Sequence, residues 1–145
     1  MSKGKNQFHF SEFWDNVRLE REFEESNLQC CTRVVSLHRC GYVALPKDHP
    51  LFGKKCSELE WIDVDGGVTF ADGTDDMWVL GWDAAHSWHI LDPSLINENN
   101  KAEYEARRNL HKHGLYIIDA DMAERETRRF ARQLAHMYET DDEND

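Results

Sequence analysis

The clearest hydrophobic pattern in the chain lies near its C-terminal end. Small and apolar residues recur there every three or four positions, which is the spacing of one helical face. The stripe comprises Ala123, Thr127, Phe130, Ala131, Leu134 and Tyr138. Asp121 and Glu124 have the spacing of a capping box, with Asp121 in the capping role. The pattern predicts an amphipathic helix of about five turns that packs on a sheet.

A similar spacing predicts a second amphipathic helix near the N-terminus. Its apolar face comprises Phe10, Phe13, Trp14 and Val17. Ser11 is a suitable N-cap, and the helix is expected to run from there toward Glu25. Phe23 lies off the apolar face and favours an earlier end or a turn.

The segments between these helices predict two hairpins. Residues 32–37 and 42–45 are rich in β-branched and apolar side chains, with a short polar break between them. Residues 61–65 and 68–71 flank Gly66-Gly67, which is a two-residue turn signal. Each pair is therefore expected to form two antiparallel strands.

The remaining elements complete an α+β fold. The nearly continuous apolar run 77–82 is typical of a central strand that is covered on both faces. A short helix is expected over residues 101–113, ended by Gly114, and a further strand over 115–118. We therefore predict a small mixed or antiparallel sheet of two hairpins plus a central strand, packed by the N-terminal and C-terminal amphipathic helices.

The length of 145 residues favours a single domain. We expect a flexible N-terminus over residues 1–7 and one α+β domain over 8–138. The last segment, 139–145, holds five acidic residues and no basic one, so it is expected to be an acidic disordered tail.

The net charge of −11 argues against nucleic acid as a partner, because a nucleic-acid-binding face is basic. No apolar run approaches the roughly 20 residues that cross a bilayer, so no membrane partner is expected either. The N-terminus lacks an apolar signal stretch, which predicts a cytoplasmic protein, in the host cytoplasm if the gene belongs to a phage. The four cysteines, without a CxxC pair, are expected to be reduced.

Candidate chemistry concentrates between Trp61 and Asp92, where four of the five tryptophans lie among carboxylates and imidazoles. Such a mixture predicts a pocket that stacks a planar ring, such as adenine, and binds its polar edge. The candidate ligand-binding residues are Asp65, Gly66, Gly67, Trp82, Asp83, His86 and Trp88. The structural alternative is that the tryptophans belong to the core and the glycines form a plain turn.

Two catalytic interpretations use the same region. Asp83 and His86 are candidates for a general acid/base pair. Asp65, Asp83, His86 and His89 are candidates for zinc or manganese ligands, although no HExxH motif is present. The structural alternative is that Asp83 caps the turn after its strand and His86 makes one hydrogen bond. No cofactor is required by any motif in the chain.

Three segments have a recognisable order and spacing: CGYVALPKDHPLFGK (40–54), IDVDGGVTFA (62–71) and WVLGWDAAH (78–86). They resemble a family of small, largely uncharacterised bacteriophage and prophage proteins with the segments GYVxVPxxHPxxG, VHGGxTF and WxxGFDxAH. The resemblance covers residues 30–136 and implies a phage-type origin, without a settled activity.

The chain departs from this family pattern at three places. It has Asp65 where the family has His, Trp82 where the family has Phe, and residues 87–89 (Ser-Trp-His) where the family has a Gly-Asp pair. A binding site tolerates such exchanges better than a proton-transfer site, where pKa and geometry are both demanding. The departures therefore favour binding over catalysis.

These observations support three functional hypotheses. The favoured one is a phage-type accessory protein that sequesters a nucleotide-like small molecule to counter host defence, in a form compatible with a homo-oligomer. The second is a hydrolase that uses Asp83 and His86, with or without a metal. The third is an acidic protein that binds and inhibits a host protein through its charged surface.

Overall fold

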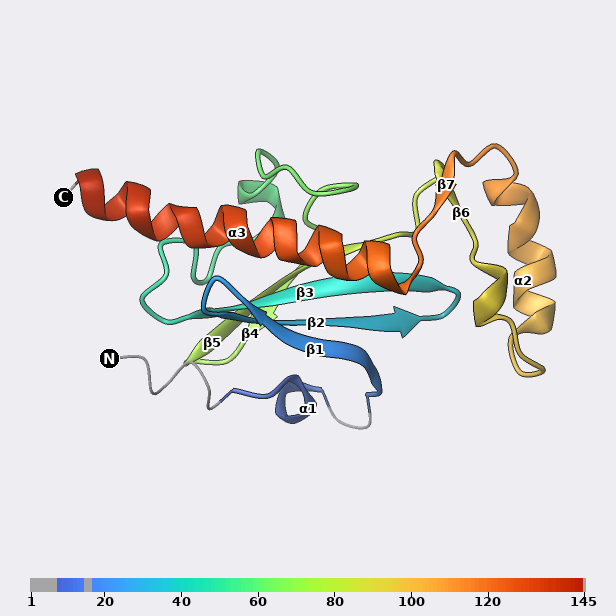
Figure 1. Cartoon of the computed structure of the whole chain (residues 1–145), viewed down its shortest axis with the longest axis horizontal. Helices are drawn as coiled ribbons and strands as arrows, with labels where there is room; N and C mark the ends of the chain where they lie inside the picture. The colour runs from blue at the N-terminus through green and yellow to red at the C-terminus, as the bar shows by residue number, and fades with distance from the viewer. Residues whose placement is uncertain (1–7, 15–16, 145) are drawn as a thin grey trace.

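The computed structural model describes residues 8–14 and 17–144, with side chains up to residue 138. The predicted flexible segment 1–7 lies outside these residues. The fold is α+β, with one long helix across a five-stranded antiparallel sheet and a small lobe at one end (Figure 1). The strand order is β1-β2-β3-β5-β4. The strands are β1 (Leu19–Glu25), β2 (Leu28–Val35), β3 (His38–Pro46), β4 (Phe70–Gly73) and β5 (Met77–Asp83).

The helix α3 (Ala120–Asn144) covers one face of the sheet. The predicted stripe is confirmed, since Ala123, Thr127, Phe130, Ala131 and Leu134 are fully buried. The predicted cap is wrong: Oδ1 of Asp119 accepts the backbone N–H of Met122 at 2.8 Å, and the helix begins one residue later. The helix continues to Asn144, through most of the segment for which a disordered tail was predicted.

The predicted N-terminal helix is largely wrong. Among the described residues of this stretch, only α1 (Phe10–Phe13) is helical, and residues 19–25 form strand β1. Exposure in β1 alternates at every residue, which is the period of a strand. The acidic residues that face solvent are Glu20, Glu22 and Glu24. The pattern was obscured because Arg21 and Glu25, on the inward side, are charged as well.

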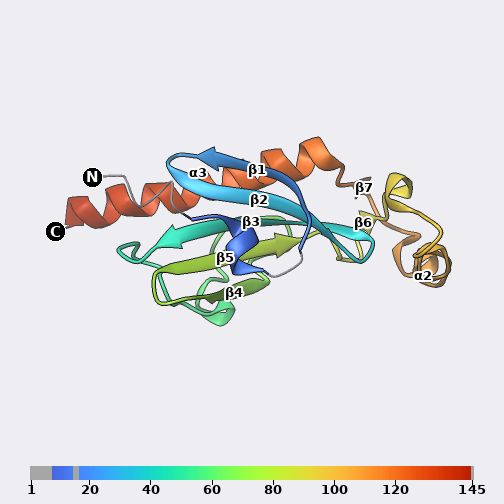
Figure 2. The ribbon, with the colours of Figure 1, turned by 90° about the horizontal axis from the view of Figure 1, so that it is seen from below.

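Residues 8–14 cover the face of the sheet opposite to α3, as Figure 2 shows from below. Phe10 is fully buried there, and the Trp14 ring lies 4.6 Å from that of Tyr42 in an edge-to-face contact. The guanidinium of Arg33 lies 4.2 Å above the Trp14 ring. Of the residues expected on one helix face, Phe10, Phe13 and Trp14 therefore do pack together, from a single helical turn and its flank.

The first predicted hairpin is confirmed, but its turn lies earlier, because Val35 pairs with His38. The second predicted hairpin is wrong. Residues 61–69 form an irregular loop, and β4 instead pairs with β5. Gly66 and Gly67 do turn the chain, with φ angles of 79° and 82°. Ile62, Val64 and Val68 are buried in the core cluster that includes α3, so the apolar residues of this loop serve packing rather than strand pairing.

The lobe at the end of the sheet contains the parallel pair β6 (His89–Ile90) and β7 (Tyr116–Ile117). The predicted helix over 101–113 corresponds to α2 (Lys101–Arg108) and the following 3-10 turn η4 (Asn109–His111). Two further 3-10 turns are η2 (Cys56–Glu58) and η3 (Pro93–Leu95). In the described part of the chain, none of the helices has the length and hydrophobicity that crossing a membrane requires.

Candidate functional site

Asp65 lies at the centre of a hydrogen-bonded cluster that joins three distant segments. Trp88 donates its indole N–H to Oδ1 of Asp65 at 3.0 Å. His89 Nε2 lies 3.1 Å from Oδ2, and the hydroxyl of Tyr116 donates to the same oxygen at 2.8 Å. The irregular loop, the turn before β6, β6 itself and β7 supply these residues, so the cluster ties the lobe to the sheet.

The hydrogen bonds of His89 define which of its ring nitrogens carries a proton. Its Nδ1 lies 3.1 Å from the backbone N–H of His86 and accepts that hydrogen bond. Nδ1 therefore holds a lone pair, and Nε2 carries the proton that is donated to Asp65. The His89 side chain is 1% exposed, so these two partners take the place of water.

Burial by itself raises the pKa of Asp65, but the hydrogen bonds from His89, Trp88 and Tyr116 outweigh it. The pKa of this carboxyl consequently lies below its ordinary value of 3.8. Burial and the bond to Asp65 raise the pKa of Tyr116 to about 12, despite a smaller opposing effect of Trp88. At neutral pH the pair is therefore a carboxylate that accepts and a phenol that donates.

Asp83 and His86 lie beside this cluster but do not form a hydrogen-bonded pair. His86 Nδ1 is 3.7 Å from Oδ1 of Asp83, which exceeds a hydrogen-bond distance. Asp83 instead accepts hydrogen bonds from the hydroxyl of Thr69 at 2.7 Å and from the backbone N–H of Ala85 at 3.0 Å. The second bond is the one expected if Asp83 caps the turn after β5.

The His86 ring is held by packing. It stacks on Trp88 with ring centroids 4.6 Å apart and planes 16° apart. A Cβ at Gly66 would overlap the same ring, so the glycine allows the loop to approach it. Asp65, Gly66, His86 and Trp88 are therefore neighbours in space.

Trp82 is an exception among those residues. Its side chain is 1% exposed, and its indole N–H donates to the hydroxyl of Thr127 at 3.0 Å beneath α3. It is a core residue and cannot contact a ligand in this structure. The prediction of Trp82 as a ligand-binding residue is therefore corrected.

The structure does not support the predicted metal site. Among the described residues, no group of three or more histidine, cysteine, aspartate or glutamate side chains has an arrangement that could hold a metal ion. Both carboxylate oxygens of Asp65 and both ring nitrogens of His89 are already engaged in hydrogen bonds. Metal binding there would have to break the cluster.

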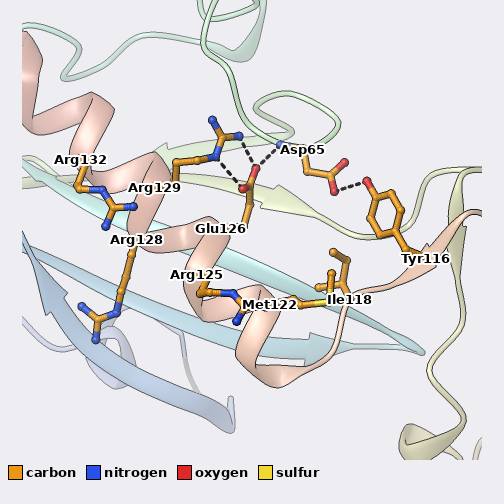
Figure 3. A pocket seen from close by; sticks show the side chains of 9 residues that line it. All are labelled: Asp65, Tyr116, Ile118, Met122, Arg125, Glu126, Arg128, Arg129 and Arg132. Atoms are coloured by element: carbon orange, nitrogen blue, oxygen red, sulfur yellow. Dashed lines mark hydrogen bonds and ion pairs between the residues drawn. The ribbon is translucent and has the colours of Figure 1, made fainter.

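A groove of about 400 Å³ lies beside Asp65, along the outer side of α3 (Figure 3). It is lined by Asp65, Tyr116, Ile118, Met122, Arg125, Glu126, Arg128, Arg129 and Arg132. The four arginines recur at intervals of three, one and three residues and spread over the exposed side of the helix, with Arg128 reaching Glu25 of β1 and Arg129 reaching Asp63 of the irregular loop. This feature is readable in the sequence, but it has the appearance of an ordinary solvated face.

The four arginines differ in how far their charge is compensated. Arg128 and Arg129 each form two ion pairs with carboxylates. These pairs are Arg128–Glu25 (2.9 Å), Arg128–Glu124 (2.8 Å), Arg129–Asp63 (3.0 Å) and Arg129–Glu126 (2.8 Å). With the side chains that the structure describes, Arg132 has one long ion pair, 3.7 Å from Glu25. Arg125 has no ion pair with any described residue, so the groove carries uncompensated positive charge beside it.

No protein-family model, curated protein or solved structure significantly matches this chain.

All four cysteines are free thiols, and Cys30, Cys31 and Cys40 are buried. Burial raises the pKa of Cys40 to about 11 and that of Cys30 to about 12. Since the thiolate is the reactive form of cysteine, neither residue is suited to act as a nucleophile at neutral pH.

Proposed function

We propose that this protein binds a small anionic molecule, such as a nucleotide-like phosphate ester, in the groove beside α3. The observation that carries the proposal is Arg125, an exposed arginine of the groove without an ion pair to any described residue. It lies in a chain with 28 acidic residues and 17 lysines and arginines, where partners for a cation are abundant. An arginine left unpaired beside a groove is available to a ligand.

The chemistry of the groove suits a phosphate or a carboxylate. A guanidinium presents five N–H donors in a planar fork, which matches the oxygens of both groups. Arg132 supplements Arg125, because its single ion pair at 3.7 Å leaves most of its donors unused. The volume of about 400 Å³ lies within the range of small-molecule sites.

The biological role that we propose is sequestration. The resemblance to bacteriophage proteins favours an accessory protein that removes a nucleotide-like signal of the host, and the departures from the family pattern favour binding over turnover. A protein of this kind needs affinity and abundance, and its ligand should leave the binding site chemically unchanged.

The proposal is tested by thermal shift and calorimetry with phosphate, pyrophosphate, AMP and ADP. A ligand that binds the folded state raises the melting temperature by mass action. Arg125→Gln should weaken binding about tenfold to a hundredfold, because a charge-assisted hydrogen bond contributes roughly 1.5 to 3 kcal/mol. The matched control is Arg108→Gln, an exposed arginine of α2 in the lobe. Equal effects of the two variants, or no binding of any of these compounds, would contradict the proposal.

A hydrolase remains the second candidate, and one observation favours it. Nδ1 of His86 is buried without a hydrogen-bond partner and lies 3.7 Å from Oδ1 of Asp83. A small movement would convert this contact into the aspartate–histidine pair of a general base. Mass spectrometry of the same mixtures distinguishes the two functions: a product that forms with the wild type and is lost in His86→Gln would establish hydrolysis.

A further inference from the structure

The hydroxyl of Tyr116 has a fixed polarity at the end of the groove. Asp65 is a carboxylate, which can only accept hydrogen bonds. The single hydroxyl proton of Tyr116 is therefore donated in the 2.8 Å bond between them. The bonds from His89 and Trp88 hold the carboxylate in place and supply it with two further donors. The phenol oxygen consequently has only acceptor capacity left for the groove, and a weaker hydrogen-bonding contact from the indole N–H of Trp88 takes up part of it.

The groove is chemically different at its two ends. Figure 3 shows Tyr116 and Asp65 at one end, the side chains of Ile118 and Met122 in the middle, and arginines further along α3. The middle offers apolar contact beside the carboxylate of Glu126, which is bound by Arg129 and by the backbone N–H of Asp65, and the other arginines attract an anion. The Tyr116 end offers a lone pair beside a negative charge, and therefore disfavours a ligand that presents an acceptor or a second anion there.

We propose that Tyr116, oriented by Asp65, selects anionic ligands that carry a hydrogen-bond donor, an amino or hydroxyl group, at the end remote from the anion. This inference rests on the proposed anion-binding function and narrows its ligand class. Tyr116 is the specificity-determining residue, and Asp65 is a positioning residue that acts through it. The ligand combines an anionic group, an apolar or planar body and a donor.

Three small probes separate these features. Phenyl phosphate has the anion and the body, 4-aminophenyl phosphate adds a donor, and 4-nitrophenyl phosphate adds an acceptor at the same position. Their dissociation constants are measured by calorimetry or ligand-observed NMR. With the wild type, we expect the amino compound to bind about three- to tenfold more tightly than phenyl phosphate, as one net hydrogen bond allows. The nitro compound should bind no better than phenyl phosphate.

Tyr116→Phe removes the acceptor and keeps the ring. We expect this variant to bind the amino compound and phenyl phosphate equally, while its melting temperature reports whether the fold is retained. The ratio of the two affinities is the decisive readout, because general damage to the groove weakens both compounds alike. An amino preference that persists in Tyr116→Phe, or that is absent in the wild type, would overturn the inference.

The test also separates this inference from the function on which it rests. The probes can bind the wild type, with affinities that Arg125→Gln lowers for all three, while the amino group does not increase the affinity. In that case the anion-binding function is supported and the role of Tyr116 is refuted. If none of the three probes binds the wild type, and phosphate, pyrophosphate, AMP and ADP do not bind either, both proposals fall together.

Discussion

Replacing Asp65 with asparagine should destabilise the protein far more than a typical surface exchange. Asparagine keeps the shape but loses the charge and one acceptor. If its carbonyl oxygen takes the place of Oδ2, the hydrogen bonds from His89 and Tyr116 persist without charge assistance. The amide NH₂ then faces the indole N–H of Trp88, so two donors oppose each other without an acceptor. If the amide is reversed, both His89 and Tyr116 face a donor.

The magnitude follows from the burial of the cluster. An unsatisfied buried polar group costs about 1 to 3 kcal/mol, and the lost charge assistance on the remaining bonds adds to this. The Asp65 side chain is 15% exposed, so water relieves part of the cost near Trp88 and Tyr116. We therefore expect Asp65→Asn to lower the free energy of unfolding by about 2 to 4 kcal/mol at pH 7.

Urea unfolding at pH 7 measures this difference through the midpoint and the slope of the transition. The control is Asp63→Asn. Its side chain is 82% exposed and forms a surface ion pair with Arg129, so its loss should cost at most about 1 kcal/mol. A loss of less than about 0.5 kcal/mol in Asp65→Asn, or equal losses in the two variants, would refute the role of Asp65 as the centre of a stabilising buried cluster.

The pH dependence gives a second check with a defined sign. Because the folded-state pKa of Asp65 is depressed below 3.8, its carboxylate stabilises the fold above the unfolded-state pKa. That contribution is lost as the pH falls through the folded-state pKa. The gap in stability between the wild type and Asp65→Asn should therefore be constant from pH 7 to about 4.5 and shrink below about 4. A gap that grows on acidification would contradict this assignment.

Two further substitutions test the packing around the site. Gly66→Ala should lower the free energy of unfolding by about 2 to 4 kcal/mol, because the new methyl group overlaps the His86 ring and the positive φ is strained. Gly67→Ala has open space around it and should lower it by only about 1 kcal/mol. Equal losses of stability in thermal unfolding would argue against the contact between Gly66 and His86. Thr127→Val leaves the N–H of buried Trp82 without its acceptor and should lower the free energy of unfolding by about 1 to 3 kcal/mol. Thr127→Ser keeps the hydroxyl and should lower it by less. A lower melting temperature for Thr127→Ser than for Thr127→Val would show that the methyl group matters more than the hydrogen bond.

Elements with a local sequence pattern could be predicted from the sequence, whereas elements that depend on contacts between distant parts of the chain could not. The stripe of α3 could be predicted because its residues repeat with the helical period and face one apolar surface. Strand β1 could not, because two of its inward-facing positions are charged. Arg21 pairs with Glu124 at 3.0 Å and Glu25 with Arg128 at 2.9 Å, about 100 residues away in the chain. A local pattern does not reveal partners at that separation.

The same reasoning applies to the candidate site. Asp65, His86 and Trp88 could be grouped from the sequence because reactive side chains are dense in one short stretch. Tyr116 was missed, since it lies 51 residues from Asp65 and follows a helix without a motif. Arg125 was missed for a different reason: an exposed arginine on an amphipathic helix becomes informative only when the absence of an ion pair is visible in three dimensions.

The alternation in β1 has a consequence for how separate molecules meet. β1 is an edge strand, and an edge offers unpaired backbone groups to a strand of another molecule. The outward residues Glu22 and Glu24 would place two rows of carboxylates together if two copies joined along this edge, whereas Glu20 is paired with the buried Arg39 at 2.8 Å. At neutral pH their repulsion opposes such pairing, so the strand that most resembled a helix in the sequence also protects the sheet against growth into an aggregate.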